Sequence, residues 1–162
     1  MLAKSKYKDN VNLLTCKLKV KYFLVMAKKM RESACLISRS LDIFGDKWSL
    51  LIIRDLMQNR VCSYGDFLKS GEKIATNILA TRLQDLEENG IISKEKHPDY
   101  KAKMVYSLTK KGIDLLPILV ETYLWAEKYY GTPSDENARL VGVNTDKEAF
   151  IADTKRFLTM KE

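Results

Sequence analysis

The sequence of 162 residues predicts a mainly α-helical fold with one small β-hairpin, an α+β arrangement around a single core. Apolar residues recur at helical spacing in several segments. Two short strand-prone segments, 91–96 and 104–108, are separated by turn-forming residues. A chain of this length builds one core rather than two. We therefore expect one main domain at 31–130, between a basic extension at 1–30 and a linker with a short helix at 131–162.

The first two expected helices begin the domain. Apolar residues at helical spacing in 35–44 predict the first helix, and Gly45 follows where a glycine commonly ends one. Asp46 is suited to cap the second helix, whose segment 48–57 is apolar on nearly all sides. The second helix must therefore lie at the centre of the core.

A pair of helices joined by a turn is expected next. Ser63 can cap a short amphipathic helix that ends near Gly71. The following helix, 75–89, has an apolar stripe on one side and ends at Gly90. Short hydrogen-bonding side chains near a helix N-terminus can approach base edges in the DNA major groove. The small and polar residues on the exposed side are Thr76, Asn77, Ala80 and Thr81.

The predicted hairpin follows this helix and is basic. Its segments 91–96 and 104–108 flank a turn that contains Pro98. A hairpin of this size is unstable alone, so apolar side chains must dock it on the helices. Its lysines are then free to meet phosphate groups. We expect docking by Ile91, Val105, Tyr106 and Leu108, and phosphate contact by Lys94, Lys96, Lys101 and Lys103.

A long helical stretch closes the domain. Thr109 can cap it, and Pro117 should kink or divide it. Its apolar residues cover more than one stripe, so the stretch is either sandwiched inside the monomer or paired with a symmetry mate. We expect pairing, and hence a homodimer. The expected interface residues are Leu116, Val120, Tyr123, Leu124 and Trp125.

Charge is distributed unevenly along the chain. Residues 1–34 carry nine basic and two acidic side chains, which account for the whole net charge of +7. Two interpretations of 1–25 stay open. The segment is either a flexible arm that attracts phosphate groups, or an artefact, because translation begins at Met26 or Met30. We prefer the second. The neutral body has one basic edge, at 94–111, which favours a localised contact surface.

Several function classes are not expected. The three cysteines, Cys16, Cys35 and Cys62, lack metal-ligand spacing, and His97 is the only histidine, so we expect no metal and no cofactor. No arrangement of nucleophile and base indicates an enzyme. The apolar runs are too short to span a bilayer, and the free thiols suit reducing cytoplasm. The expected location is therefore cytoplasmic, without a membrane partner.

Three helices, a basic hairpin and a closing helix in this order are the plan of a winged helix-turn-helix. The stretch 35–129 resembles the HxlR family of bacterial regulators, within the broader MarR-like group. Each matching segment is weak alone, but together they occur in order and at natural spacing. The segments are Cys35, LDIFGDKWSLLIIRDL at 41–56, YGDFL at 64–68, IATNILATRL at 74–83, LEENGI at 86–91 and YSLTKKG at 106–112.

The resemblance implies roles for these segments. Residues 75–89 would be the recognition helix, 94–103 the wing, and the first helix with the long helix the dimer interface. Family members often carry serine and lysine early in the recognition helix, where this chain has Ala75 and Asn77. Arg82 could reach a phosphate or could instead pair with Asp85 or Asp55.

The resemblance also implies a function. We expect a dimeric, sequence-specific transcriptional regulator, and in particular a repressor, that binds a pseudo-palindromic operator in double-stranded DNA. Several similar proteins sense quinones, aldehydes or oxidants with a cysteine where this chain has Cys35; the alternative is an inert, packed thiol. We expect Cys62 to have only a packing role. The competing hypothesis for the whole domain is a protein-docking module without sequence-specific DNA binding.

Overall fold

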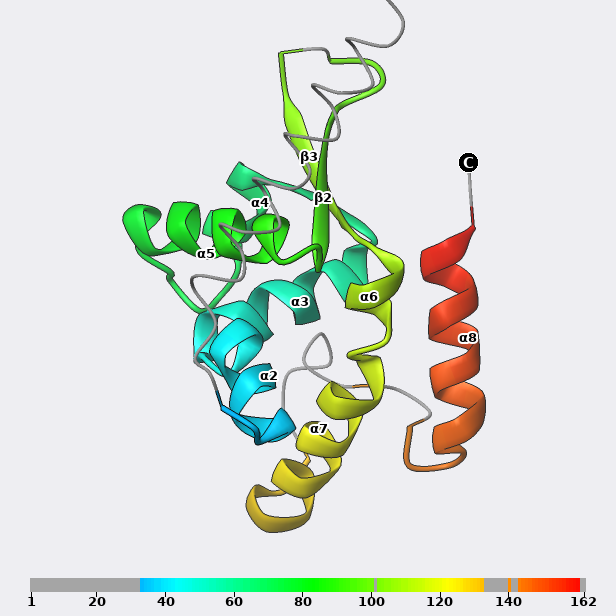
Figure 1. Cartoon of the computed structure of the whole chain (residues 1–162). Coiled ribbons are helices and arrows are strands. Elements are labelled where there is room, and N and C mark those ends of the chain that lie inside the picture. The colour runs from blue at the N-terminus through cyan, green and yellow to red at the C-terminus, as the bar shows by residue number, and fades with distance from the viewer. Residues whose placement is uncertain (1–32, 101, 133–139, 141–142, 161–162) are drawn as a thin grey trace, which may run out of the picture. The chain divides into compact units, whose positions relative to one another are not determined.

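The computed structural model describes residues 33–100, 102–132, 140 and 143–160 (Figure 1). The chain divides into two units, 1–42 and 43–162. The expected extension at 1–30 lies outside the described residues. Helix α2 (Leu36–Phe44) begins in the first unit, at the place predicted from the sequence.

The second unit is organised around helix α3 (Lys47–Asn59). The Asp46 carboxylate accepts hydrogen bonds from the backbone N–H groups of Trp48 and Ser49, at 3.0 Å each, so the expected cap is present. Ile53 and Leu56 are fully buried, which confirms the central position of this helix. The helix ends at Arg60, whose φ of +64° breaks the helical path without a glycine.

Helices α4 (Tyr64–Lys69) and α5 (Thr76–Glu88) form the predicted pair. Ser63 and Asp66 make a reciprocal capping box at the start of α4. At the end of α5, Gly90 has a φ of +67° and the Ile91 N–H donates to the Leu86 carbonyl at 2.9 Å. This geometry needs a residue that tolerates the left-handed region, so the predicted glycine stop is confirmed.

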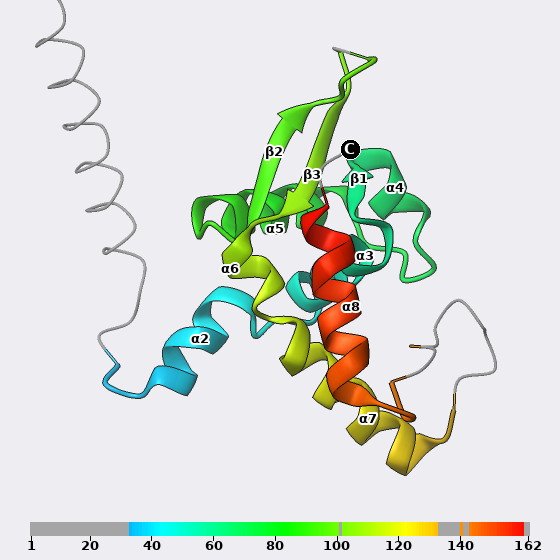
Figure 2. The same ribbon diagram turned by 90° about the vertical axis from the view of Figure 1, so that its right-hand side faces the viewer.

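The sheet has three antiparallel strands, β1 (Val61–Ser63), β2 (Ile92–Lys96) and β3 (Met104–Leu108), in the order β1-β3-β2. The prediction of a two-stranded ribbon was therefore incomplete. Strand β1 has too few residues to show a period of two in the sequence. It is a strand because β3 pairs with it. The β2–β3 hairpin projects beyond the helices of this unit in both views (Figures 1 and 2).

Two helices replace the single long stretch after the hairpin. Helix α6 (Lys110–Ile113) ends before α7 (Leu116–Tyr130), and Pro117 lies in the first turn of α7, which confirms the predicted division. Thr109 caps α6, as its hydroxyl accepts from the Gly112 N–H at 3.2 Å. A Cβ at Gly112 would lie 2.2 Å from the Ile91 carbonyl oxygen, so only glycine allows α6 this close to the hairpin.

The expected C-terminal helix is also present. Helix α8 (Lys147–Thr159) starts at Asp146, whose carboxylate accepts from the Ala149 N–H at 2.9 Å. It packs against α7 (Figure 2). Its partly buried apolar residues, which contact the core, are Phe150, Ile151 and Leu158. None of the helices in the described ranges is long and apolar enough to cross a membrane.

Candidate nucleic-acid interface

Helix α5 has two chemically distinct sides. Leu79, Leu83 and Leu86 are buried against the core, and α3 lies directly behind them. The side chains on the opposite side are small, mostly polar and exposed, which suits close approach to base edges. They include the four residues predicted from the sequence, Thr76, Asn77, Ala80 and Thr81.

The N-terminus of α5 is held in place but not capped by a side chain. Ala75 occupies the cap position, so no side-chain oxygen accepts from the first backbone N–H groups. The serine that family members often carry at this place would supply a capping hydroxyl, which Ala75 lacks. The Tyr64 hydroxyl donates to the Thr76 carbonyl at 2.8 Å and so ties α4 to the first turn of α5. Uncapped N–H groups at a positive helix end can bind a phosphate oxygen.

Arg82 is engaged within the chain. Its guanidinium lies 3.3 Å from the Asp85 carboxylate and 3.6 Å from that of Asp46. Asp55 instead pairs with Arg54 at 2.7 Å, and burial raises the pKa of the Asp55 carboxyl. Of the two interpretations of Arg82, the geometry favours packing between the start of α3 and the recognition helix.

The hairpin presents exposed lysines. Lys94 and Lys96 lie on β2, and Lys103 follows the tip, where the His97 N–H donates to the Lys103 carbonyl at 2.8 Å. The Lys94 Nζ also lies 5.7 Å from the centre of the Tyr106 ring. Lys101 lies outside the described residues.

One basic residue of this surface was missed from the sequence. Lys69, at the end of α4, lines a cleft of about 490 Å³ together with Lys94 and Lys103. Hydrogen bonds from Ser63 lower the pKa of the Asp66 carboxyl, and the charges of Lys103 and Lys69 contribute further. Lys69 is far from the hairpin in sequence, and only the pairing of β1 with β3 brings it near.

The two described cysteines differ sharply. Cys35 is exposed just before α2, and its backbone N–H donates to the Ser33 hydroxyl at 3.2 Å. Cys62 is buried, and burial raises the pKa of its thiol to about 12. A thiol with that pKa is almost fully protonated at neutral pH and therefore unreactive. The packing role expected for Cys62 is confirmed.

The expected dimer residues separate into two groups. Leu116 and Val120 are buried within the monomer at 3% and 0% exposure, so their side chains leave almost no surface for contact with a second copy. The chain's own core covers them. Tyr123 and Leu124 are half-buried, whereas Trp125 is 56% exposed. The large apolar residues that α7 leaves exposed at helical spacing are Ile118, Trp125 and Tyr129.

The described residues therefore combine helices α3, α4 and α5 with a docked β-hairpin and a polar, exposed side of α5. This combination defines a winged helix-turn-helix domain, the architecture of many DNA-binding regulators. Among the described residues, no cluster of three or more potential metal ligands occurs. The chain belongs to the HxlR-like helix-turn-helix family, which it matches over residues 43–134. Proteins of this family are transcriptional regulators rather than enzymes.

Relatives in several bacteria agree with this assignment. YdeP of Bacillus subtilis, named as an HTH-type transcriptional regulator, is 33% identical over 95 residues, covering 59% of this chain and 73% of YdeP. The regulator sll1512 of Synechocystis is 30% identical over 108 residues, covering 67% of this chain and 79% of sll1512. YodB of Bacillus subtilis is 31% identical over 87 residues, covering 54% of this chain and 77% of YodB.

Solved structures have the same fold. PA1607, a candidate transcription factor, superposes with a TM-score of 0.59 at 37% identity, covering 67% of this chain and 74% of PA1607. The oxidised form of the redox regulator HypR superposes with a TM-score of 0.53 at 27% identity, covering 58% of this chain and 96% of HypR. The reduced form of YodB superposes with a TM-score of 0.50 at 30% identity, covering 64% of this chain and 100% of YodB.

Proposed function

We propose that this protein is a homodimeric repressor that binds a pseudo-palindromic operator through α5 and the hairpin. The observation that carries the proposal is the recognition face of α5, which exposes Thr76, Asn77 and Thr81 on a helix whose first N–H groups are uncapped. Small polar side chains can reach base edges, and the uncapped helix end supplies donors for a phosphate.

The wing supplies the contribution that does not depend on DNA sequence. Lys94, Lys96 and Lys103 are exposed, and Lys69 extends the basic surface across the cleft beside the hairpin. Each lysine that neutralises a phosphate releases counterions, so affinity should fall steeply with salt. Lys101 belongs to the same proposed surface by its position in the sequence. Arg82 would act there mainly by fixing the position of α5.

Dimerisation would use the exposed face of α7 and the apolar residues of α2. On α7 this face is Ile118, Trp125 and Tyr129, whereas Tyr123 and Leu124 are half-buried on other sides of the helix. On α2, the side chains of Leu36 and Ile37 are more than 70% exposed. Apolar residues this exposed are typical of surfaces that a second subunit covers. A two-fold axis would place two copies of α5 about one DNA turn apart.

Cys35 would make the repressor responsive to thiol-reactive or oxidising compounds. The thiol is exposed at the start of α2, beside a shallow cleft lined by Ile37 and Leu41. The similar proteins HypR and YodB support the proposal, since HypR is described as a redox regulator. Modification of a thiol beside a proposed dimer helix would change how the two subunits pair.

A mobility shift of the full chain tests the DNA-binding part. The probe is DNA from immediately upstream of the protein's own gene, with unrelated DNA as competitor. We expect a specific shift that Lys94→Ala/Lys103→Ala weakens, and a shallower dependence of log affinity on log salt by about 0.9 per lysine removed. Lys128→Ala, an exposed lysine on α7, is the matched control and should change neither.

The same assay tests the signal. Diamide should abolish the shift, and Cys35→Ser should preserve it in the presence of diamide. No specific shift on this promoter or its neighbours would favour a protein-docking module. A shift insensitive to diamide would retain the DNA-binding proposal and reject Cys35 as a sensor.

A further inference from the structure

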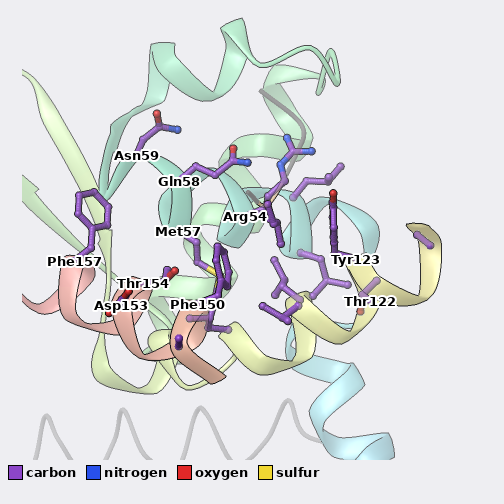
Figure 3. A pocket seen from close by; sticks show the side chains of 18 of the residues that line it. Arg54, Met57, Gln58, Asn59, Thr122, Tyr123, Phe150, Asp153, Thr154 and Phe157 are labelled. Atoms are coloured by element: carbon purple, nitrogen blue, oxygen red, sulfur yellow. The ribbon is translucent and has the colours of Figure 1, made fainter. Parts of the chain in front are cut away.

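A cavity lies between three helices, away from the recognition face of α5. It has a volume of about 1000 Å³ and is walled by α3, α7 and α8. Figure 3 shows side chains from all three helices converging on it: Met57 from α3, Tyr123 from α7 and Phe150 from α8. We propose that this cavity binds an uncharged, aromatic small molecule.

The size and lining of the cavity fit such a ligand. Small-molecule sites commonly have volumes of about 300 to 1000 Å³ and are lined mainly by apolar and aromatic groups. Phe150, Phe157 and Tyr123 supply three rings, and Leu119 and Met57 supply flexible apolar surface. Tyr123 and Gln58 also line it and add polar groups to the wall, and the Tyr123 hydroxyl donates to the Glu127 carboxylate at 3.4 Å.

The charges in the wall indicate that the ligand is neutral. Arg54 is paired with both Asp55 and Glu72, at 2.7 and 2.9 Å. Asp146 accepts from the backbone at the start of α8, and Asp153 lies 3.3 Å from Arg156. Each charged side chain that lines the cavity is thus already compensated within the chain. A charged ligand would lose its hydration without gaining an unpaired counter-charge.

Helix α8, which walls one side of the cavity, lies outside the family match. The HxlR-like match ends at residue 134, and α8 begins at Lys147. Helix α8 is held in place by ion pairs from Lys147 to Glu121 on α7, at 2.8 Å, and from Lys155 to Asp114, at 3.6 Å. Because α8 covers part of this side of α7, the space between the helices is a partly open cavity whose size suits a small molecule.

The cavity also has a structural link to α5. Helix α3 contributes Leu50, Leu51, Arg54 and Met57 to the cavity wall, and it packs against the buried side of α5. A ligand in the cavity therefore lies one helix away from the recognition helix. The binding proposal itself does not depend on DNA binding and is tested without DNA.

A fluorescence titration of the full chain with N-phenyl-1-naphthylamine, an uncharged aromatic probe, tests the proposal. We expect saturable binding of one probe per chain. Ala149→Phe, which fills the cavity from α8, should weaken binding by at least about tenfold. Ala152→Phe adds the same ring to an exposed position of α8 that does not line the cavity, and it should leave affinity unchanged.

A second substitution that fills the cavity, placed on another helix, shows whether a loss of binding comes from filling the cavity or from misfolding of α8. Ala126→Trp adds bulk from α7 and should also weaken binding. Non-saturable fluorescence, or equal losses in Ala149→Phe and Ala152→Phe, would overturn the proposal. So would a fall in the dimer population of Ala149→Phe, measured by sedimentation, with no change in probe affinity, because the cavity would then be a contact between subunits.

Discussion

Helices α5 and α7 bury similar apolar stripes but leave opposite kinds of surface exposed. Leu79 of α5 and Leu116 of α7 are both almost completely buried in one core. On its outer side α5 carries Thr76 and Asn77, whereas α7 carries Trp125 at 56% exposure. The buried sides hold the fold together, and the exposed sides are the surfaces available to a partner. Small polar groups suit DNA, and an aromatic stripe suits a second copy of the chain.

The largest expected effect concerns the shared buried sides. Leu79→Ala and Leu116→Ala should each lower the free energy of unfolding by about 2 to 5 kcal/mol, because each leaves a cavity in the core. Urea unfolding at several protein concentrations measures this and separates it from dimer dissociation. Gln84→Ala, at an exposed position of α5, is the control. If Leu116→Ala dissociated the dimer without lowering the free energy of unfolding, Leu116 would belong to the subunit interface.

The next prediction tests the exposed side of α7. Trp125→Lys should raise the dimer dissociation constant by about thirtyfold or more, since buried aromatic anchors in interfaces commonly contribute 2 kcal/mol or more. Sedimentation at micromolar concentration measures the population of monomers. Ala152→Lys places the same charge on an exposed position of α8 and should leave the dimer intact. An unchanged dimer in Trp125→Lys would assign the interface to other surfaces.

The exposed side of α5 should give a smaller effect that is confined to DNA. Asn77→Ala should weaken operator binding by about 1 to 3 kcal/mol, the range for loss of one good base contact. Unfolding and dimerisation should not change, because Asn77 is exposed. Gln84→Ala, two turns further along the same helix, is the matched control in a mobility shift. Equal losses for both variants would mean that α5 does not read bases through its first turns.

The smallest expected effect separates the two interpretations of Arg82. If its contacts with Asp46 and Asp85 position α5, Arg82→Ala should lower stability by less than about 1 kcal/mol and leave the salt dependence of DNA binding unchanged. Partly exposed ion pairs contribute little, which limits the effect. A salt dependence that becomes shallower by about 0.9 would instead identify Arg82 as a phosphate contact.

The helix ends were predictable because their causes are local. Asp46 caps α3 through N–H groups two and three residues away, and Thr109 caps α6 in the same way. Pro117 divides the last helical stretch because its own ring excludes a hydrogen bond. The polar side of α5 was predictable for a similar reason, since helical periodicity alone assigns residues to one side or the other.

The remaining features depend on contacts between residues distant in sequence, and only the tertiary structure decided them. Strand β1 exists because β3 lies beside it, and this pairing brings Lys69 to the wing. Apolar composition alone could not separate the core residue Val120 from the exposed Trp125, because both belong to the same apolar helix. The placement of α8 over α7 creates the cavity. Sequence periodicity specifies the faces of each helix, but the fold determines which neighbour covers each face.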